Sequence, residues 1–238
     1  MVKTVETSKL QAVIFDLDGT LLDTLDDLTA ATNYALSRFG YGAFDKDRVR
    51  RYVGNGVPKL IERALCYATT GCEPTESGGF SDRALFDACL AIFTEYYGEH
   101  SADLTAPYDG VTELISELKR RGIKTAIVTN KYEAAAKALK ARFFAGIDAV
   151  VGAADDIRPK PAPDGVYKAL GVLGVDKSRC VYVGDGETDM KTAKNCGISV
   201  VAVTWGFRDE RVLRAFEPDR IIHKPSELLA ALGLCESE

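Results

Sequence analysis

Two aspartates near the start of the chain have the spacing most suggestive of chemistry. The apolar run Ala12-Val13-Ile14 predicts the end of a buried strand, and Asp16 and Asp18 follow it in the hexapeptide FDLDGT. Side chains at i and i+2 of extended backbone point the same way. At a separation of about 4 Å, two carboxylate charges repel by about 4 kcal/mol at an effective dielectric constant of about 20. We therefore expect a cation here, or one carboxyl group that stays protonated.

Gly19, in the same hexapeptide, lets the chain turn sharply and present backbone N–H groups to an anion. The carboxyl end of a strand is also where ligands of open α/β folds bind. A metal ion, a phosphate group and a carboxylate nucleophile would together account for these features. The alternative is an ordinary Asp-Gly turn at a polar strand end.

Three further segments carry polar residues where strands are expected to end. Thr129 and Asn130 follow an apolar run and lead into a helix, so that a hydroxyl group and free amides could hold phosphoryl oxygens. Lys160 lies in the stiff proline-rich loop RPKPAP, which limits where it points. Asp185 and Asp189, at i and i+4, can face one point, and carboxylates without His or Cys neighbours favour Mg²⁺ over zinc. Taken singly, these segments also suit a helix cap, a solvated lysine and an acidic surface loop.

Hydrophobic periodicity predicts an α/β fold with a doubly wound parallel sheet and an inserted helical domain. The expected strands are 12–16, 124–129, 149–151, 180–184, 199–204 and 220–222. The helices between them are 111–121, 134–142, 163–173, 188–196 and 226–232. The stretch after the first strand reads as helices at 25–39, 57–68 and 82–97 with a loop at 69–80. We therefore expect a core made of residues 1–22 and 102–238, interrupted by a helical insertion at 23–101.

The ordered set of motifs resembles the four motifs of the haloacid dehalogenase (HAD) superfamily, whose commonest members are Mg²⁺-dependent phosphatases. The matching residues, in chain order, are Asp16 and Asp18, Thr129, Lys160, and Asp185 with Asp189. The resemblance covers the chain from Leu10 to Leu232. It implies a Rossmann-like core with an α-helical cap in the first insertion point.

The resemblance also implies roles for these residues. Asp16 would be the nucleophile that forms an aspartyl-phosphate, and Asp18 the general acid and base. The Asp16 carboxylate, the Asp18 backbone carbonyl and Asp185 would hold Mg²⁺, and Asp189 would orient Lys160 or a metal-bound water. The phosphate group would be bound by Gly19, Thr129, Asn130 and Lys160. One position departs from the family, since Gly186 stands where a Ser or Thr often follows the metal-binding aspartate.

The cap sequence YVGNGVPKLIERAL is similar to that of phosphoglycolate phosphatases, as is Thr129-Asn130-Lys131 in the core. The resemblance favours 2-phosphoglycolate, or a similar small phosphate ester, as the substrate. Asn55, Lys59 and Arg63 are the candidates to meet its carboxylate, and helix phase alone does not select among them. The alternatives are a nucleotide or sugar phosphatase, a pyrophosphatase, a β-phosphoglucomutase-like isomerase, and a non-catalytic binding protein on the same scaffold.

Composition limits the classes of partner that we expect for this chain. The 238 residues carry a formal net charge of −5, which argues against nucleic acid. No stretch approaches the roughly 20 apolar residues that cross a bilayer, and the polar segment Met1–Lys9 does not resemble a secretory signal. Scattered cysteines indicate reduced thiols in the cytoplasm, without a disulfide or zinc site: Cys66, Cys72, Cys89, Cys180, Cys196 and Cys235. We expect structural roles for His100 and His223, and either a monomer or a homodimer.

Overall fold

The computed structural model describes residues 10–75 and 79–234. Three sequence-based expectations touch positions beyond these ranges. The polar segment Met1–Lys9 and Cys235 lie outside the described residues, as do positions 76–78 of the expected loop.

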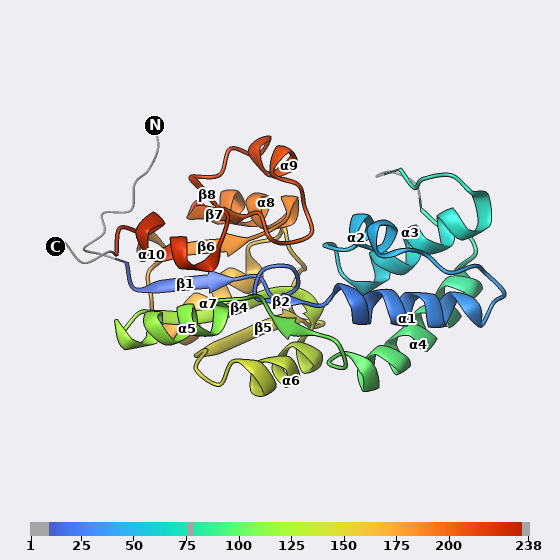
Figure 1. The fold of residues 1–238 in the computed structure, drawn as a ribbon, viewed down its shortest axis with the longest axis horizontal. Helices are drawn as coiled ribbons and strands as arrows, with labels where there is room; N and C mark the ends of the chain where they lie inside the picture. Colours follow the sequence, from blue (N-terminus) through green and yellow to red (C-terminus); the bar gives the residue numbers. More distant parts are fainter. Residues whose placement is uncertain (1–9, 76–78, 235–238) are drawn as a thin grey trace. The chain divides into compact units, whose positions relative to one another are not determined.

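The chain divides into two compact units, of which the first comprises Met1–Asp23 and Pro107–Glu238. This unit is built on a six-stranded sheet with the order β5-β4-β1-β6-β7-β8, and every neighbouring pair is parallel (Figure 1). The strands are β1 (Ala12–Phe15), β4 (Lys124–Tyr132), β5 (Ala149–Ala153), β6 (Cys180–Gly184), β7 (Ser199–Val203) and β8 (Arg220–Ile222). Two short strands, β2 (Leu22–Asp23) and β3 (Ala106–Pro107), form a separate sheet. The doubly wound parallel sheet predicted from the sequence is confirmed.

Helices cover both faces of the large sheet. They are α5 (Val111–Arg120), α6 (Glu133–Phe143), α7 (Asp164–Leu173), α8 (Glu187–Cys196), α9 (Glu210–Arg214) and α10 (Leu228–Ala231), with short helical turns η2 (Lys177–Arg179) and η3 (Pro225–Glu227). Apolar residues of α7, α8 and α9 join one buried cluster with side chains of the strands. Helices α5 and α6 contact β4 but contribute no residue to this cluster, as expected for the opposite face of a sheet whose crossovers are right-handed.

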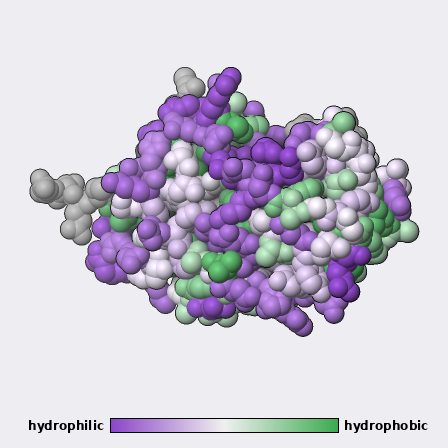
Figure 2. All heavy atoms as spheres, turned by 45° about the vertical axis from the view of Figure 1, so that its right-hand side comes forward, coloured by the Kyte–Doolittle hydropathy of each residue, from purple (hydrophilic) through white to green (hydrophobic). Residues whose placement is uncertain are grey.

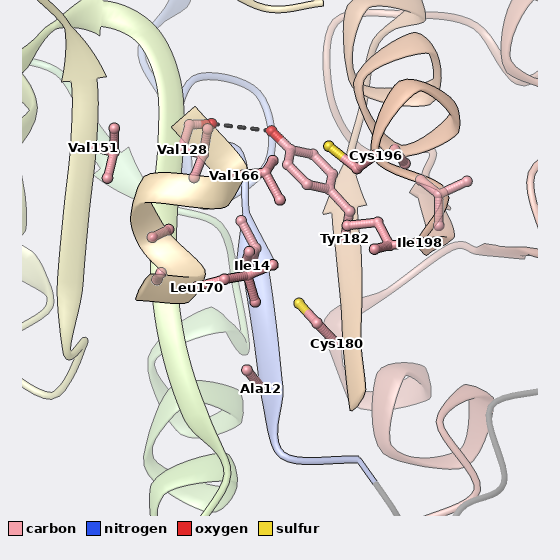
Figure 3. Packing of buried hydrophobic residues seen from close by; sticks show 14 of the residues in the cluster. Ala12, Ile14, Val128, Val151, Val166, Leu170, Cys180, Tyr182, Cys196 and Ile198 are labelled. Carbon is pink, nitrogen blue, oxygen red and sulfur yellow. Dashed lines mark hydrogen bonds between the residues drawn. The ribbon is translucent and has the colours of Figure 1, made fainter. Parts of the chain in front are cut away.

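The buried cluster between the sheet and α7 links the core to the strand ends. Ala12 and Ile14 of β1 and Val128 of β4 enter it together with Val166 of α7, and Figure 3 shows Tyr182 of β6 among them. The Tyr182 hydroxyl donates a hydrogen bond of 3.0 Å to the Val128 carbonyl. A buried phenol requires such a partner, since an unpaired polar group in the core is costly.

The second compact unit, Thr24–Ala106, is helical. Its helices are α1 (Leu25–Ser37), α2 (Lys46–Tyr52), α3 (Val57–Thr70) and α4 (Arg83–His100). Asp45 and Asp82 cap α2 and α4, because each carboxylate accepts a hydrogen bond from the first turn of its helix. Buried apolar faces of α1, α3 and α4 form the interior, including Leu28, Leu65 and Phe93. The inserted helical domain of the predicted fold class is thus present.

Some short elements were not predicted. Helix α2 has the sequence KDRVRRY, in which only Val49 and Tyr52 are buried, so it shows too little hydrophobic periodicity to reveal itself. Strands β2 and β3 and helix α9 are also too short for a pattern. Helix α3 continues two residues past its expected end at 68, and Gly71 in a left-handed conformation terminates it.

One face of the molecule is seen with its residues coloured by hydropathy in Figure 2. Figure 2 shows hydrophilic residues over much of the visible face, with hydrophobic ones in small patches. Among the described residues, no helix combines the length and the hydropathy needed to cross a membrane. Free thiols occur at Cys66, Cys72, Cys89, Cys180 and Cys196, and burial raises the pKa of Cys180 to about 12.

A buried carboxylate in the helical unit generates a stability prediction. Asp27 is 3% exposed and accepts hydrogen bonds from the Leu104 and Thr105 backbone N–H groups and from the Thr105 hydroxyl. Replacing Asp27 with Ala leaves these donors without an acceptor, so we expect the free energy of unfolding to fall by about 3 kcal/mol in urea titrations. The neighbouring Asp26 forms a solvent-exposed ion pair with Lys46. Asp26→Ala, the matched control, should cost less than about 1 kcal/mol; equal losses would contradict the prediction.

Candidate active site

The predicted core residues converge at the carboxyl edge of the large sheet. Asp16 follows β1, Asp185 follows β6, and Thr129 lies near the end of β4, while Lys160 comes from the loop after β5. Strands β4 and β6 flank β1 on its two sides. Because all three strands are parallel, their carboxyl ends deliver these side chains to one place.

Lys160 is the positive centre of the site. Its Nζ lies 2.9 Å from Asp16 Oδ1 and 2.7 Å from Asp189 Oδ1, and the Lys160 side chain is only 3% exposed. It also donates a hydrogen bond of 3.1 Å to the Tyr182 hydroxyl. Asp189 is therefore placed to orient Lys160, one of the two alternatives considered from the sequence.

Three carboxylates gather around this lysine. Ligand oxygens of Asp16, Asp185 and Asp189 all lie within 4.8 Å of one another. Of the residues expected to hold a cation, Asp16 and Asp185 are in this cluster, whereas the Asp18 side chain is not. This arrangement is compatible with the prediction, which used only the backbone carbonyl of Asp18. Hard carboxylate oxygens suit a divalent cation such as Mg²⁺.

The acidic cluster holds more negative charge than one lysine neutralises, and its pKa values reflect this. Burial raises the pKa of Asp16 well above its usual value, and the charges of Asp189 and Asp185 add to the rise against the opposing effect of Lys160. Burial and Asp189 also raise the pKa of Asp185 to about 7. Burial alone would lower the pKa of Lys160, but Asp16 and Asp189 raise it well above its usual value. A divalent cation would relieve this excess of negative charge, so these residues fit a metal ion.

Asp18 points to a different cation. Its Oδ1 accepts a hydrogen bond of 2.8 Å from Nζ of Lys131, whose side chain is 4% exposed. The sequence placed Lys131 in the tripeptide Thr129-Asn130-Lys131 but predicted no role for it. The available signals were the resemblance of this tripeptide to phosphoglycolate phosphatases and the place of Lys131 two residues after Thr129, and the structure buries both Thr129 and Lys131.

Asn130 fixes the loop that carries Lys160. Its Oδ1 accepts a hydrogen bond of 2.7 Å from the Lys160 backbone N–H, and its Nδ2 donates one of 3.1 Å to the Lys160 carbonyl. The Asn130 side chain is therefore engaged with this loop.

The Thr129 hydroxyl accepts a hydrogen bond from the Lys131 N–H. Gly186, which stands where the family often has Ser or Thr, donates its N–H to Asp189 Oδ2 at 3.0 Å.

The candidate cap residues belong to the second compact unit. Arg63 donates hydrogen bonds to the Tyr52 carbonyl at 2.7 Å and to Asn55 Oδ1 at 2.9 Å. Lys59 pairs with Glu62 at 2.9 Å. Arg63 and Asn55 are therefore neighbours, which helix phase alone could not establish.

Partners of the two histidines were also not visible in the sequence. Nδ1 of His100 lies 2.8 Å from Asp103 Oδ2, and Nδ1 of His223 lies 3.0 Å from the Thr204 hydroxyl. The His100 contact lies at the end of α4, and the His223 contact joins the residues that follow β7 and β8. Neither contact involves the acidic cluster.

The chain is similar to known proteins over most of its length. A family model described as haloacid dehalogenase-like hydrolase matches residues 13–203. A phosphoglycolate phosphatase of Mesorhizobium japonicum is 37% identical over 215 residues, which cover 88% of this chain and 89% of the relative. One from Neisseria meningitidis is 35% identical over 92% of both chains.

A solved structure agrees with the sequence relatives. A protein from Lactobacillus delbrueckii subsp. bulgaricus superposes with a TM-score of 0.88 and 34% identity, over 94% of this chain and 98% of that chain. The family model spans the segments that carry Asp16, Thr129, Lys160 and Asp185. The chain therefore belongs to the haloacid dehalogenase-like hydrolase family and is an enzyme of the phosphatase type.

Proposed function

We propose that this enzyme hydrolyses small phosphate monoesters, with Asp16 as the nucleophile and Mg²⁺ as its cation. The observation that carries the proposal is the meeting of Asp16 with Lys160, at 2.9 Å, inside a cluster that includes Asp185. A carboxylate can attack an anionic phosphoryl group only where positive charge offsets their repulsion. Lys160 supplies one such charge.

In this proposal Asp16 attacks the phosphorus atom, and the bond to the leaving oxygen breaks as an aspartyl-phosphate forms. The Lys160 ammonium group, the Thr129 hydroxyl and the Asn130 backbone amide hold the equatorial oxygens. The Gly19 N–H, which the sequence suggested as a further phosphate donor, instead donates a hydrogen bond of 2.8 Å to the Leu22 carbonyl. Magnesium, held by the carboxylates of Asp16 and Asp185 and by a backbone carbonyl, would supply Lewis-acid charge that stabilises the transfer.

Asp18 gives a proton to the leaving oxygen and later takes one from the water that hydrolyses the aspartyl-phosphate. Its ion pair with Lys131 limits which way its carboxylate points. Asp189 keeps Lys160 directed toward Asp16, since both carboxylates contact the same Nζ.

The proposed substrate is 2-phosphoglycolate, because the relatives from Mesorhizobium japonicum and Neisseria meningitidis are phosphoglycolate phosphatases. Asn55, Lys59 and Arg63 are the proposed contacts for its carboxylate. The proposal also includes residues 23–101 as a cap on a core of 1–22 and 102–238. It further includes a cytoplasmic location, a monomer or homodimer, and no nucleic-acid partner.

A phosphate-release screen with Mg²⁺ tests the substrate. Across a panel of small metabolites, we expect the highest kcat/KM for 2-phosphoglycolate, since its carboxylate offers the cap a second anchor. Pyrophosphate and sugar phosphates serve as comparison substrates. Preference for one of these would replace the proposed substrate, and no hydrolysis of any phosphate ester would indicate a binding protein.

Substitution of the two aspartates tests their roles. Asp16→Asn should abolish turnover, because the amide is not a nucleophile for phosphorus. Asp18→Asn should lower kcat by about 10²- to 10⁴-fold, the usual contribution of a general acid or base. Circular dichroism spectra should match those of the unmodified protein. Full activity of purified Asp16→Asn would refute the nucleophile assignment.

Chelation and pH together test the cation. EDTA should silence the enzyme and Mg²⁺ restore it. The raised pKa of Asp185, about 7, means that its charged form is disfavoured in the folded, metal-free protein. Metal-free stability should therefore fall as pH rises from about 4 toward about 7 and remain low above it, which Mg²⁺ should reverse.

Asp185→Asn isolates this effect from other titrating groups. In EDTA, the melting temperature of the variant minus that of the unmodified protein should increase between pH 5 and 8, in thermal scans at closely spaced pH values. A difference that stays constant over this interval would contradict the claim that the charged form of Asp185 is disfavoured in the metal-free protein.

A further inference from the structure

We propose that the loop after β7, residues 205–208, holds Asp185 in the orientation that receives the cation, and that Trp205 and Thr20 are positioning residues of the metal site. The inference rests on the proposed function in one respect, that a cation binds at the acidic cluster. Neither residue was assigned a role from the sequence, and neither belongs to that cluster.

Each oxygen of the Asp185 carboxylate is held by a different loop. Oδ1 accepts a hydrogen bond of 2.8 Å from the Thr20 hydroxyl, in the loop after β1. Oδ2 accepts one of 2.8 Å from the Phe207 backbone N–H, in the loop after β7. Asp185 is 3% exposed, so water does not readily replace either donor. Two donors on opposite oxygens leave the carboxylate little freedom to rotate.

Trp205 joins the two loops that supply these donors. Its indole Nε1 donates a hydrogen bond of 3.0 Å to the Thr20 carbonyl. Since Phe207 lies two residues further along the same loop, the contacts form a closed ring that runs through Trp205, Thr20, Asp185 and Phe207. Losing the indole N–H would remove the direct link between the two loops, although Thr20 and Phe207 would each keep the bond to Asp185.

The backbones of the three loops approach too closely to shift independently. A Cβ atom at Gly206 would lie 2.3 Å from the Gly19 carbonyl oxygen and 2.4 Å from Asp185 Cβ. Arg208 adds another link through its ion pair of 2.8 Å with Glu187, two residues after Asp185. The ring is therefore part of a tightly packed unit, and a movement of the 205–208 loop would displace Asp185.

The ring leaves Asp185 able to bind a cation. A carboxylate oxygen has about two acceptor directions, and one on each oxygen is used by Thr20 or Phe207. The remaining acceptor directions are available to a cation. One Asp185 oxygen lies within 4.8 Å of ligand oxygens of Asp16 and Asp189. Groups that orient a metal ligand in this way typically account for about 10- to 100-fold in metal affinity.

The test measures metal affinity without substrate. Mn²⁺ is titrated into the metal-free protein, and the free ion is followed by its electron paramagnetic resonance signal. Trp205→Phe keeps an aromatic side chain but deletes the N–H, and Thr20→Val keeps the shape but deletes the hydroxyl. We expect the Kd for Mn²⁺ to rise by about tenfold or more in each. Thr20→Ser restores the hydroxyl and should return the Kd to within about twofold of the unmodified protein.

Thr204→Val is the matched control. It deletes a hydroxyl next to Trp205 that contacts His223 on the β8 side instead of the acidic cluster, so the Kd should be unchanged. Circular dichroism establishes folding, and if Trp205→Phe does not fold, the Thr20→Val and Thr20→Ser pair decides. Unchanged affinity in a folded Trp205→Phe or Thr20→Val protein overturns the inference, as does an unmodified protein that binds no Mn²⁺.

A parallel phosphate-release assay separates this inference from the proposed function. Ring-dependent Mn²⁺ binding by a protein that hydrolyses no phosphate ester would refute the proposed function and leave the inference standing. Hydrolysis of a phosphate ester together with unchanged Mn²⁺ affinity in the folded variants would refute the inference and leave the proposed function standing.

Discussion

The gathering of Asp16 with the buried Asp185 and Asp189 beside one buried lysine is the constraint on which the site depends. Asp189 is 2% and the Lys160 side chain 3% exposed, so their pairing at 2.7 Å occurs away from solvent. Removing ions from water costs several kcal/mol each unless partners compensate. The surrounding segments supply these partners: the Tyr182 hydroxyl accepts a hydrogen bond from Lys160, the Gly186 N–H donates one to Asp189, and the Thr20 hydroxyl donates one to Asp185.

The hydrophobic core and the charged site share Tyr182. Tyr182 packs in the cluster between β1 and α7, yet its hydroxyl contacts both Lys160 and the Val128 carbonyl. Both contacts require that β6 and β4 flank β1 in matching register, as their pairing with Ala12 shows. A shift of one residue in β6 would turn Tyr182 to the other face and remove it from both the core and the site.

Sequence reasoning recovered the sheet, most helices and the convergence of Asp16 with Asp185, because strand ends and i, i+4 spacing are local signals. It could not predict which individual side chains of distant segments pair with one another. Trp205 and Thr20 are 185 positions apart, and the Lys131 pairing with Asp18 spans 113. Such pairs depend on how loops from different strands fold over one another, and no local periodicity encodes that arrangement. Helix α2 was missed for the opposite reason, since its local signal is too weak.

The contacts within the helical unit bear on how the proposed substrate would be chosen. Arg63 and Lys59 are four residues apart on α3 and therefore share a face. Arg63 currently donates to Asn55, a neutral and exposed acceptor. Charge-assisted bonds to a carboxylate are roughly twice as strong as bonds to a neutral group, so exchange of the Asn55 amide for a substrate carboxylate would be favourable. Lys59 already shares its charge with Glu62 at 2.9 Å, so a second carboxylate would gain less from it. Of the two cations, Arg63 is therefore the better suited to carboxylate recognition.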